Sequence, residues 1–314
     1  MIVTEKICDM IIIGGGPAGC ACALYARRSG LSVVLVEKAM VGGQMLLTDK
    51  IDNYPGFSEN GIDGFLLAEK MKNGVERFGT EILNAEVKKV HLFNKIKRVE
   101  TDKGELNAKT VVVATGAEPR KLGVKNETEF IGKGVHYCTH CDGRFYKGKK
   151  VAVVGGGNSA VSSALYLSKI AEEVFVVHRR DTFRSDSILT QMLQDRKNIT
   201  PLYNKTVSGI VACGDLFGGL LLTDTATSAE QKVACDGVFV AIGNVPVTRF
   251  LNHSLKLDGN GYVITNENTE AGIPGVYAVG DVRTKLLRQI VTAVSDGAVC
   301  ASVAEEYINK TRFD

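Results

Sequence analysis

Two cysteines, Cys138 and Cys141, stand three positions apart and are followed directly by Asp142. In a cytosolic protein with nucleotide-binding units, a Cys-x-x-Cys pair is typical of a redox dithiol. Thiol–disulfide exchange needs an attacking thiolate and a proton for the departing sulfur, which an adjacent carboxyl group can supply. We therefore predict that Cys138, Cys141 and Asp142 are the catalytic residues of a disulfide exchange.

Other interpretations of this segment remain open. A structural zinc ion would need a second pair of ligands, and the sequence has no second Cys-x-x-Cys; His136 and His140 would complete a site only with unusually compact spacing. No metal is therefore predicted. Asp142 could instead be a turn residue before Gly143 or a helix N-cap. His140 could stabilise a thiolate or point to solvent.

A dithiol that turns over needs an electron donor, and the sequence contains two copies of one dinucleotide-binding pattern. Each copy is a buried-strand pattern, then a glycine loop, then a helical pattern. In such loops the first glycine permits the turn, the second lets the backbone approach a pyrophosphate, and the third small residue lets helix and strand pack closely. Two loops predict two dinucleotides, or one dinucleotide and a decayed copy. The predicted loop residues are Gly14, Gly16, Pro17, Ala18 and Gly19 in the first copy and Gly155, Gly157, Asn158, Ser159 and Ala160 in the second.

The residues at the end of the next strand distinguish the two cofactors. Glu37 and His178 each stand 23 residues after the first glycine of their loop. An acid at this place can accept the hydroxyls of a ribose without a 2′-phosphate, which fits FAD. The second copy instead has the cationic run His178, Arg179 and Arg180, with Arg184 nearby. Such a run favours the 2′-phosphate of NADPH over NADH, although a basic run can also be a solvated turn.

Size and composition limit the remaining possibilities. A chain of 314 residues is long enough for about two domains, and a net charge of +3 is too small to predict a nucleic-acid partner. No apolar run reaches the ~20 residues that span a membrane, and residues 1–10 are typical of a first strand, so we expect a cytoplasmic protein. The other cysteines are expected to pack as small hydrophobic residues: Cys8, Cys20, Cys22, Cys213, Cys235 and Cys300.

Taken together in this order, the motifs resemble those of the low-molecular-weight thioredoxin reductases along nearly the whole chain. Beyond the loops and the dithiol, the resemblance includes Gly42-Gly43-Gln44, residues 51–56, residues 114–117, Ala241-Ile242-Gly243, Gly280-Asp281-Val282 and Arg288-Gln289. The larger relatives of this family carry their cysteines soon after the first glycine loop, whereas residues 38–60 here contain none.

The resemblance implies an enzyme that transfers electrons from NADPH through FAD and the dithiol to thioredoxin or a thioredoxin-like protein, and that forms a homodimer. Cys138 would exchange with the protein substrate, Cys141 would face the flavin, and Asp142 would manage the proton. Arg179, Arg180 and Arg184 would bind the NADPH phosphate. The residues that it assigns to FAD, besides the first loop, are Glu37, Lys38, Gly42, Gly43, Gln44, Asn53, Asp281, Arg288, Gln289, Ile290 and Ala293.

The implied fold class is α/β, with two Rossmann-like three-layer ββα nucleotide-binding domains, the NADPH domain being inserted into the FAD domain. Residues 1–117 and 246–314 would form the FAD domain and residues 118–245 the NADPH domain, with glycine and proline at both crossings. Because nicotinamide and dithiol must reach one flavin in turn, we expect the inserted domain to rotate between two poses.

Two departures from the family pattern bear on function. Ser162-Ser163 stands where many relatives have two glutamates, and His140 is bulky for its place between the cysteines. A related flavoprotein that acts on another small redox protein, or that passes electrons to oxygen, is the alternative. A non-catalytic flavin-binding sensor is a second alternative of a different class.

Overall fold

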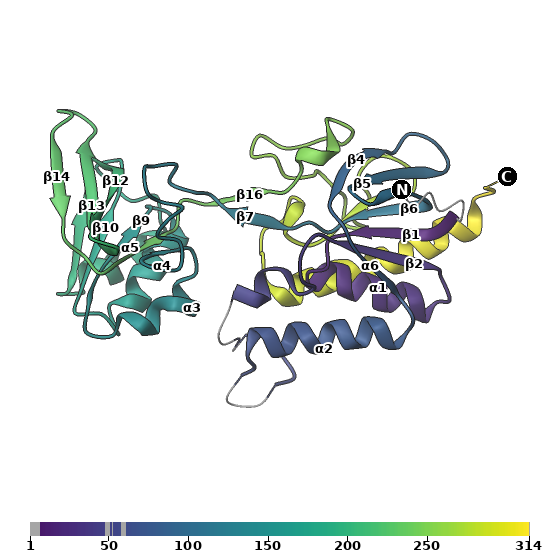
Figure 1. Cartoon of the computed structure of the whole chain (residues 1–314), viewed down its shortest axis with the longest axis horizontal. Helices are drawn as coiled ribbons and strands as arrows, with labels where there is room; N and C mark the ends of the chain where they lie inside the picture. Colours follow the sequence, from purple (N-terminus) through teal and green to yellow (C-terminus); the bar gives the residue numbers. More distant parts are fainter. Residues whose placement is uncertain (1–6, 48–50, 52, 58–60, 314) are drawn as a thin grey trace. The chain divides into compact units, whose positions relative to one another are not determined.

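The computed structural model describes residues 7–47, 51, 53–57 and 61–313, without the side chains of residues 47, 140 and 141. The chain divides into two compact units: Met1–Glu118 together with Val245–Asp314, and Pro119–Asn244. We call them unit 1 and unit 2. The chain crosses between them twice, at strands β7 (Ala117–Pro119) and β16 (Asn244–Pro246), which pair in a two-stranded sheet (Figure 1).

Unit 1 is built on a sheet with the order β3-β2-β1-β6-β5-β4, and β17 also pairs with β6. Its strands are β1 (Ile7–Ile13), β2 (Val33–Glu37), β3 (Glu81–Asn84), β4 (Val87–His91), β5 (Lys97–Thr101), β6 (Gly104–Val113) and β17 (Val276–Ala278). The long strand β6 belongs to two layers. Its first half pairs antiparallel with β5, and its second half lies parallel between β1 and β17.

Helices α1 (Pro17–Arg28), α2 (Gly64–Arg77) and α6 (Ile290–Lys310) lie on one side of the parallel part of this sheet (Figure 1). Strand β1 shows why both faces must be covered. Met10 and Ile12 are buried in the cluster that includes α1 and α6, while Ile11 and Ile13 are buried in the cluster on the opposite face. Successive side chains of a strand point to opposite faces of the sheet, so a strand that is apolar on both faces must lie between two layers.

Unit 2 repeats this plan with a parallel sheet of order β11-β10-β9-β15-β8. Its strands are β8 (Val135–His136), β9 (Lys150–Val154), β10 (Glu173–Val177), β11 (Ile199–Leu202) and β15 (Gly237–Val240). A separate antiparallel sheet contains β12 (Lys205–Cys213), β13 (Leu216–Asp224) and β14 (Glu230–Val233). The helices are α3 (Thr139–Asp142), α4 (Asn158–Leu167) and α5 (Ser187–Gln194).

Alternating residues of β9 join different cores, as in β1. Val151 and Val153 pack in the cluster that contains α4, whereas Ala152 and Val154 pack with residues of β13. Both units therefore have a helical layer, a parallel sheet and an antiparallel layer, and the predicted α/β fold class is confirmed. Among the helices of the described residues, none is long and apolar enough to cross a membrane.

Candidate cofactor loops and redox centre

The first glycine loop joins β1 to α1 and leaves space for a ligand at its second glycine. A Cβ atom at Gly14 would lie 2.4 Å from the carbonyl oxygen of Ala114, and one at Gly19 would lie 2.0 Å from the carbonyl oxygen of Gly14. A Cβ at Gly16, by contrast, would meet nothing within 4 Å. Gly16 is also the N-cap of α1 and provides no side-chain cap. The free N–H groups at the start of α1 suit a pyrophosphate.

Glu37, at the end of β2, is fixed by backbone donors of unit 1. Its Oε2 accepts a hydrogen bond from the N–H of Gly15 at 2.8 Å, and its Oε1 accepts one from Ala39 at 2.9 Å. The N–H of Gly42 donates to the carbonyl of Gly15 at 2.8 Å. Glu37 and the segment beginning at Gly42 are thus held against the glycine loop, as a ribose-binding acid would require.

Sequence-distant residues predicted to bind FAD converge on the same place. A Cβ atom at Gly280 would lie 2.8 Å from the Cβ of Ala18, which places the C-terminal segment against the start of α1. Asn53 donates to the Gln289 side chain at 2.8 Å across 236 positions of sequence.

Two polar groups of this region are buried without a hydrogen-bond partner in the structure. They are Oδ1 of Asp281 and Nε of Arg288, and burial raises the pKa of Asp281. Because buried polar atoms are nearly always paired, these orphaned atoms point to a ligand with hydrogen-bonding groups. Together with the open space at Gly16, they fit a bound flavin dinucleotide.

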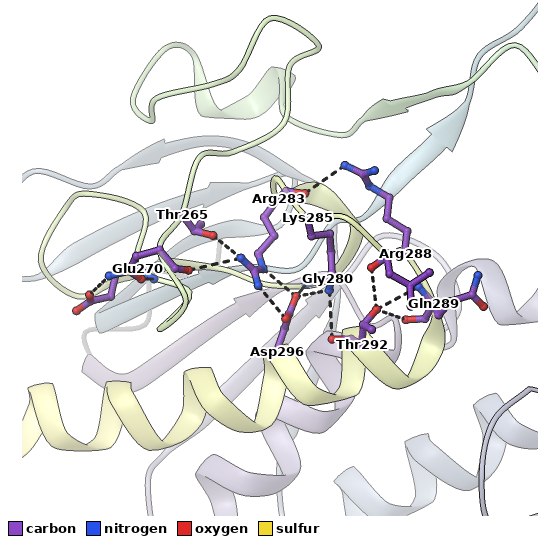
Figure 2. A network of polar contacts seen from close by, with 11 residues as sticks. Thr265, Glu270, Gly280, Arg283, Lys285, Arg288, Gln289, Thr292 and Asp296 are labelled. Atoms are coloured by element: carbon purple, nitrogen blue, oxygen red, sulfur yellow. Dashed lines mark hydrogen bonds and ion pairs between the residues drawn. The ribbon is translucent and has the colours of Figure 1, made fainter. Parts of the chain in front are cut away.

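An ion network that the sequence analysis did not predict holds this C-terminal segment together. Figure 2 shows Asp296 of α6 accepting hydrogen bonds from Arg283 Nε at 2.9 Å, Lys285 at 2.7 Å and the N–H of Gly280 at 2.9 Å. Burial alone would raise the pKa of Asp296, but these bonds more than offset burial and hold it below its ordinary value. No motif marks Asp296, because its partners become visible only in three dimensions.

The second glycine loop, between β9 and α4, has the same steric plan. A Cβ atom at Gly155 would lie 2.3 Å from the carbonyl oxygen of Ala241, whereas one at Gly157 would meet nothing within 4 Å. Gly157 is the N-cap of α4, again without a side-chain cap. Unit 2 therefore also offers an uncapped helix start with open space beside it, which fits the pyrophosphate of a second dinucleotide.

The segment that carries the arginine cluster is tied to this second loop. The N–H of Arg184 donates to the carbonyl of Gly156 at 2.7 Å. The amide of Asn158 donates to Asp186 at 3.0 Å and accepts from the backbone N–H of Asp186 at 2.8 Å. The side chains of Arg179, Arg180 and Arg184 are exposed, and none forms an ion pair within the described part of the chain. The segment therefore carries three exposed cations without an acidic partner among the described residues.

His178 differs from the sequence expectation of a cationic residue. Its ring is 5% exposed, a Cβ atom at Gly156 would lie 2.2 Å from its Nδ1, and burial lowers its pKa. A buried imidazole with a lowered pKa is neutral at pH 7. His178 thus packs beneath the loop, and the positive charge of this segment lies on its exposed arginines.

The predicted redox residues lie around the short helix α3 of unit 2. Cys138 is disulfide-bonded, and Asp142 Oδ2 lies 2.9 Å from Nδ1 of the buried His136. Thr139 donates to the hydroxyl of Ser163 at 2.9 Å, which ties this turn to α4. Ser163 is one of the two serines that depart from the family pattern. The side chains of Cys141 and His140 lie outside the described residues.

The remaining cysteines are buried, as predicted, except for Cys213. Burial raises the pKa of Cys8, Cys20 and Cys235 to about 12, so these thiols stay protonated. Cys213, expected to be buried, is exposed because it ends β12 at the turn of a hairpin. Within the described side chains, no group of three His, Cys, Asp or Glu residues is placed to hold a metal ion.

Comparison with known proteins agrees with this geometry. The family model of the pyridine nucleotide-disulphide oxidoreductases matches residues 8–297, so the chain belongs to this family. Within it, the thioredoxin reductase of Listeria monocytogenes is 41% identical over 99% of this chain and 97% of its own length. The thioredoxin reductase of Bacillus subtilis is 42% identical over 98% of this chain and 96% of its own length. The solved structure of Lactococcus lactis thioredoxin reductase has a TM-score of 0.80 at 36% identity, covering 97% of this chain and 100% of that one.

These likenesses confirm the resemblance that the motifs indicated. Membership in the family also confirms the prediction of FAD and NADPH as the two cofactors.

Proposed function

We propose that this chain reduces the disulfide of thioredoxin or of a thioredoxin-like protein, with electrons from NADPH that pass through FAD and the Cys138/Cys141 dithiol. The observation that carries the proposal is the hydrogen bond from Thr139 to Ser163. It ties the turn that follows the disulfide-bonded Cys138 to α4, the helix that begins at the second glycine loop. The names of relatives with about 40% identity over the whole chain support thioredoxin as the substrate.

Unit 1 is proposed to hold FAD. The free N–H groups after Gly16 would bind its pyrophosphate, and Glu37 would accept from its ribose. The orphaned atoms of Asp281 and Arg288 would be paired by the bound group. The remaining proposed contacts follow the family assignment and are Gly14, Pro17, Ala18, Gly19, Lys38, Gly42, Gly43, Gln44, Asn53, Gln289, Ile290 and Ala293.

Unit 2 is proposed to hold NADPH. The loop from Gly155 to Ala160 would bind the pyrophosphate, and Arg179, Arg180 and Arg184 would bind the 2′-phosphate. Their exposed and unpaired guanidinium groups support this role, because a bidentate guanidinium matches phosphate geometry. Bound FAD would supply the transfer of two electrons, taken from NADPH as a hydride, to the disulfide.

The exchange with the substrate uses this chain's own residues. The sulfur of Cys138 attacks the substrate disulfide, forming a mixed disulfide and releasing one substrate sulfur, which takes a proton from Asp142. Cys141 then attacks Cys138, which restores the internal disulfide and releases the second substrate thiol. Two cysteine thiols are oxidised and one substrate disulfide is reduced. We also propose a cytoplasmic homodimer, which the family resemblance implies.

An anaerobic titration with NADPH tests the proposal. In the wild type, NADPH should bleach the flavin absorbance, and oxidised thioredoxin should restore it. In Cys138→Ser the bleaching should persist while the restoration by thioredoxin is lost. A protein that holds no flavin, or whose disulfide survives NADPH, would refute the proposal, and high peroxide yield without thioredoxin would favour a dithiol oxidase.

A paired substitution tests which unit holds which cofactor. Gly14→Val and Gly155→Val place side chains against the carbonyl oxygens of Ala114 and Ala241, at positions with positive φ. The first variant should purify without flavin. The second should remain yellow but resist reduction by NADPH, whereas the opposite pattern would reverse the assignment.

A further inference from the structure

His136 forms a buried polar chain beside the dithiol that the proposed mechanism does not use. It ends β8, two positions before Cys138, and only 6% of its surface is exposed. Its Nδ1 lies 2.9 Å from Oδ2 of Asp142, and its Nε2 lies 2.7 Å from the hydroxyl of Tyr146. Asp142, His136 and Tyr146 are thus linked in series.

Packing fixes the orientation of the imidazole ring. Phe239 of β15 stacks on it with ring centroids 5.3 Å apart, and Tyr146 meets it edge-on at the same separation. Tyr146 is itself buried, and a Cβ atom at Gly237 would lie 2.4 Å from its ring. A ring held by two aromatic neighbours and two polar contacts has one orientation available to it.

The chemistry of the donors gives the chain a direction. An ionised Asp142 can only accept, so Nδ1 of His136 must carry the hydrogen of that contact. Burial raises the pKa of Tyr146 to about 12, so its hydroxyl remains a donor at neutral pH. In the neutral imidazole, Nε2 then accepts from Tyr146 while Nδ1 donates to Asp142.

We propose that His136, oriented by Tyr146, is a positioning residue for proton transfer by Asp142; this inference rests on the proposed function. When the departing substrate sulfur takes the proton of Asp142, the new carboxylate accepts from Nδ1–H of His136 and its charge is stabilised. The reverse transfer returns a thiol proton to Asp142. The S–S bond of the substrate breaks, and a mixed disulfide with Cys138 forms in the same step.

Several other ionisable groups lie near Asp142 and His136 and bear on the pH dependence of the reaction. Tyr146 is also influenced by Asp236 and Cys235, and Lys149 lies 5.5 Å from the centroid of its ring. The pKa of Cys235, like that of Tyr146, is raised to about 12. Cys138 also lies beside the pair, since the N–H of Asp142 donates to its carbonyl at 3.2 Å.

The test compares His136→Asn and Tyr146→Phe in the full-length flavoprotein by stopped-flow spectroscopy. Flavin reduction by NADPH should stay within about twofold of wild type in both variants. Reoxidation by thioredoxin should slow by about 10- to 100-fold in His136→Asn and by about threefold in Tyr146→Phe. Both losses are smaller than the full rate enhancement of a general acid, because Asp142 remains in place. The pH profile of reoxidation should also change in His136→Asn, because the carboxylate of Asp142 loses a hydrogen-bond donor.

His91→Asn is the matched control, since His91 also pairs with a carboxylate, that of Glu100, but belongs to unit 1. It should leave both half-reactions and their pH profiles unchanged. Combining His136→Asn with Asp142→Asn should add little to the loss caused by Asp142→Asn alone, because both act on one proton.

Three outcomes would overturn the inference. They are wild-type reoxidation in His136→Asn at every pH, a uniform loss of rate with an unmoved pH profile, and full additivity with Asp142→Asn. If His136→Asn does not fold, Tyr146→Phe decides, because it retains the packed ring and removes only the hydroxyl. Failure of NADPH to bleach the wild-type flavin would instead refute the proposed function and leave the fold of the His136 chain untouched.

Discussion

The two glycine loops have the same backbone arrangement but differ in the side chain that contacts their middle glycine. In each loop the first glycine lies against a strand-end carbonyl, of Ala114 or Ala241, and the second glycine faces open space. In unit 1 the middle glycine, Gly15, donates its N–H to the carboxylate of Glu37. In unit 2 the middle glycine instead packs against the neutral ring of His178. This contrast supports the proposal that each loop binds a pyrophosphate, while Glu37 in unit 1 and the exposed arginines in unit 2 distinguish the two nucleotides.

The units also differ in how distant segments are held to the loop. In unit 1 the buried ion network of Asp296, Arg283 and Lys285 fixes the C-terminal segment. In the described part of unit 2, the comparable tie is the exposed pair of Asn158 and Asp186. A buried network is costly to break, whereas an exposed hydrogen bond contributes little. Stability should thus depend on electrostatics far more in unit 1.

Breaking the Asp296 network should have the largest effect. Asp296→Asn leaves two cations partly unpaired, with side-chain exposures of 14% for Arg283 and 8% for Lys285, and should cost about 3–5 kcal/mol. Because the folded-state pKa of Asp296 is lowered, its contribution is present above the unfolded pKa of about 3.9 and is lost as pH falls below it. Thermal unfolding at pH 7 and at pH 3 should therefore show a difference from wild type that shrinks in acid; an equal difference at both would contradict this account.

Adding a side chain at the middle glycine should have the second-largest effect, and it should destabilise the two units by different amounts. Gly156→Ala forces the His178 ring aside and should destabilise unit 2 by about 1–3 kcal/mol. Gly15→Ala meets Val41 Cγ2 at 3.2 Å and Glu37 Cβ and Cγ at 3.4 Å, contacts that a small side-chain shift relieves, and should cost less. Melting temperatures of the two variants, measured side by side with wild type, check the order, and equal losses would show that His178 does not close its loop.

Removing the positive charge should change cofactor choice. Arg179→Gln combined with Arg180→Gln should raise the KM for NADPH about tenfold, or ~1.4 kcal/mol, and leave the KM for NADH nearly constant. Arg196→Gln, an exposed arginine of the same unit, is the control. Steady-state kinetics with both nucleotides measures the ratio, and a parallel rise in both KM values would argue against recognition of the 2′-phosphate.

The smallest effect is expected where a glycine has no steric task. A Cβ atom at Gly74, inside α2, would meet nothing within 4 Å. Gly74→Ala should stabilise unit 1 by about 0.4–1 kcal/mol, because alanine loses less conformational entropy in a helix. A raised melting temperature with unchanged flavin content would support this, and a lowered one would mean that α2 needs the glycine.

Sequence patterns predicted those features that depend on spacing along the chain. Gly14 and Gly155 have positive φ because each loop must turn sharply between strand and helix, and the glycine pattern states this locally. The charge contrast between Glu37 and the arginines is local as well. The uninterrupted apolar runs of β1 and β9 likewise predicted buried strands.

Features that depend on contacts across the fold escaped sequence analysis. The partners of Asp296 become neighbours only when α6 packs beside Gly280, and no spacing rule encodes that contact. His136 was visible as a residue near the dithiol, but its contact with Tyr146 depends on the turn after α3. The neutrality of His178 follows from burial against Gly156, which a charge count does not reveal.

The paired crossings have a consequence for how such a chain can be rebuilt. The N–H of Arg120 donates to the carbonyl of Gly243 at 2.9 Å, so the two ends of the inserted unit, each one residue further out, are close together. Replacing everything between them with a tight hairpin would impose almost no extra chain-closure entropy on the remaining polypeptide. Unit 2 is thus an insertion whose ends meet, and another domain with equally close termini could be inserted at the same point of unit 1.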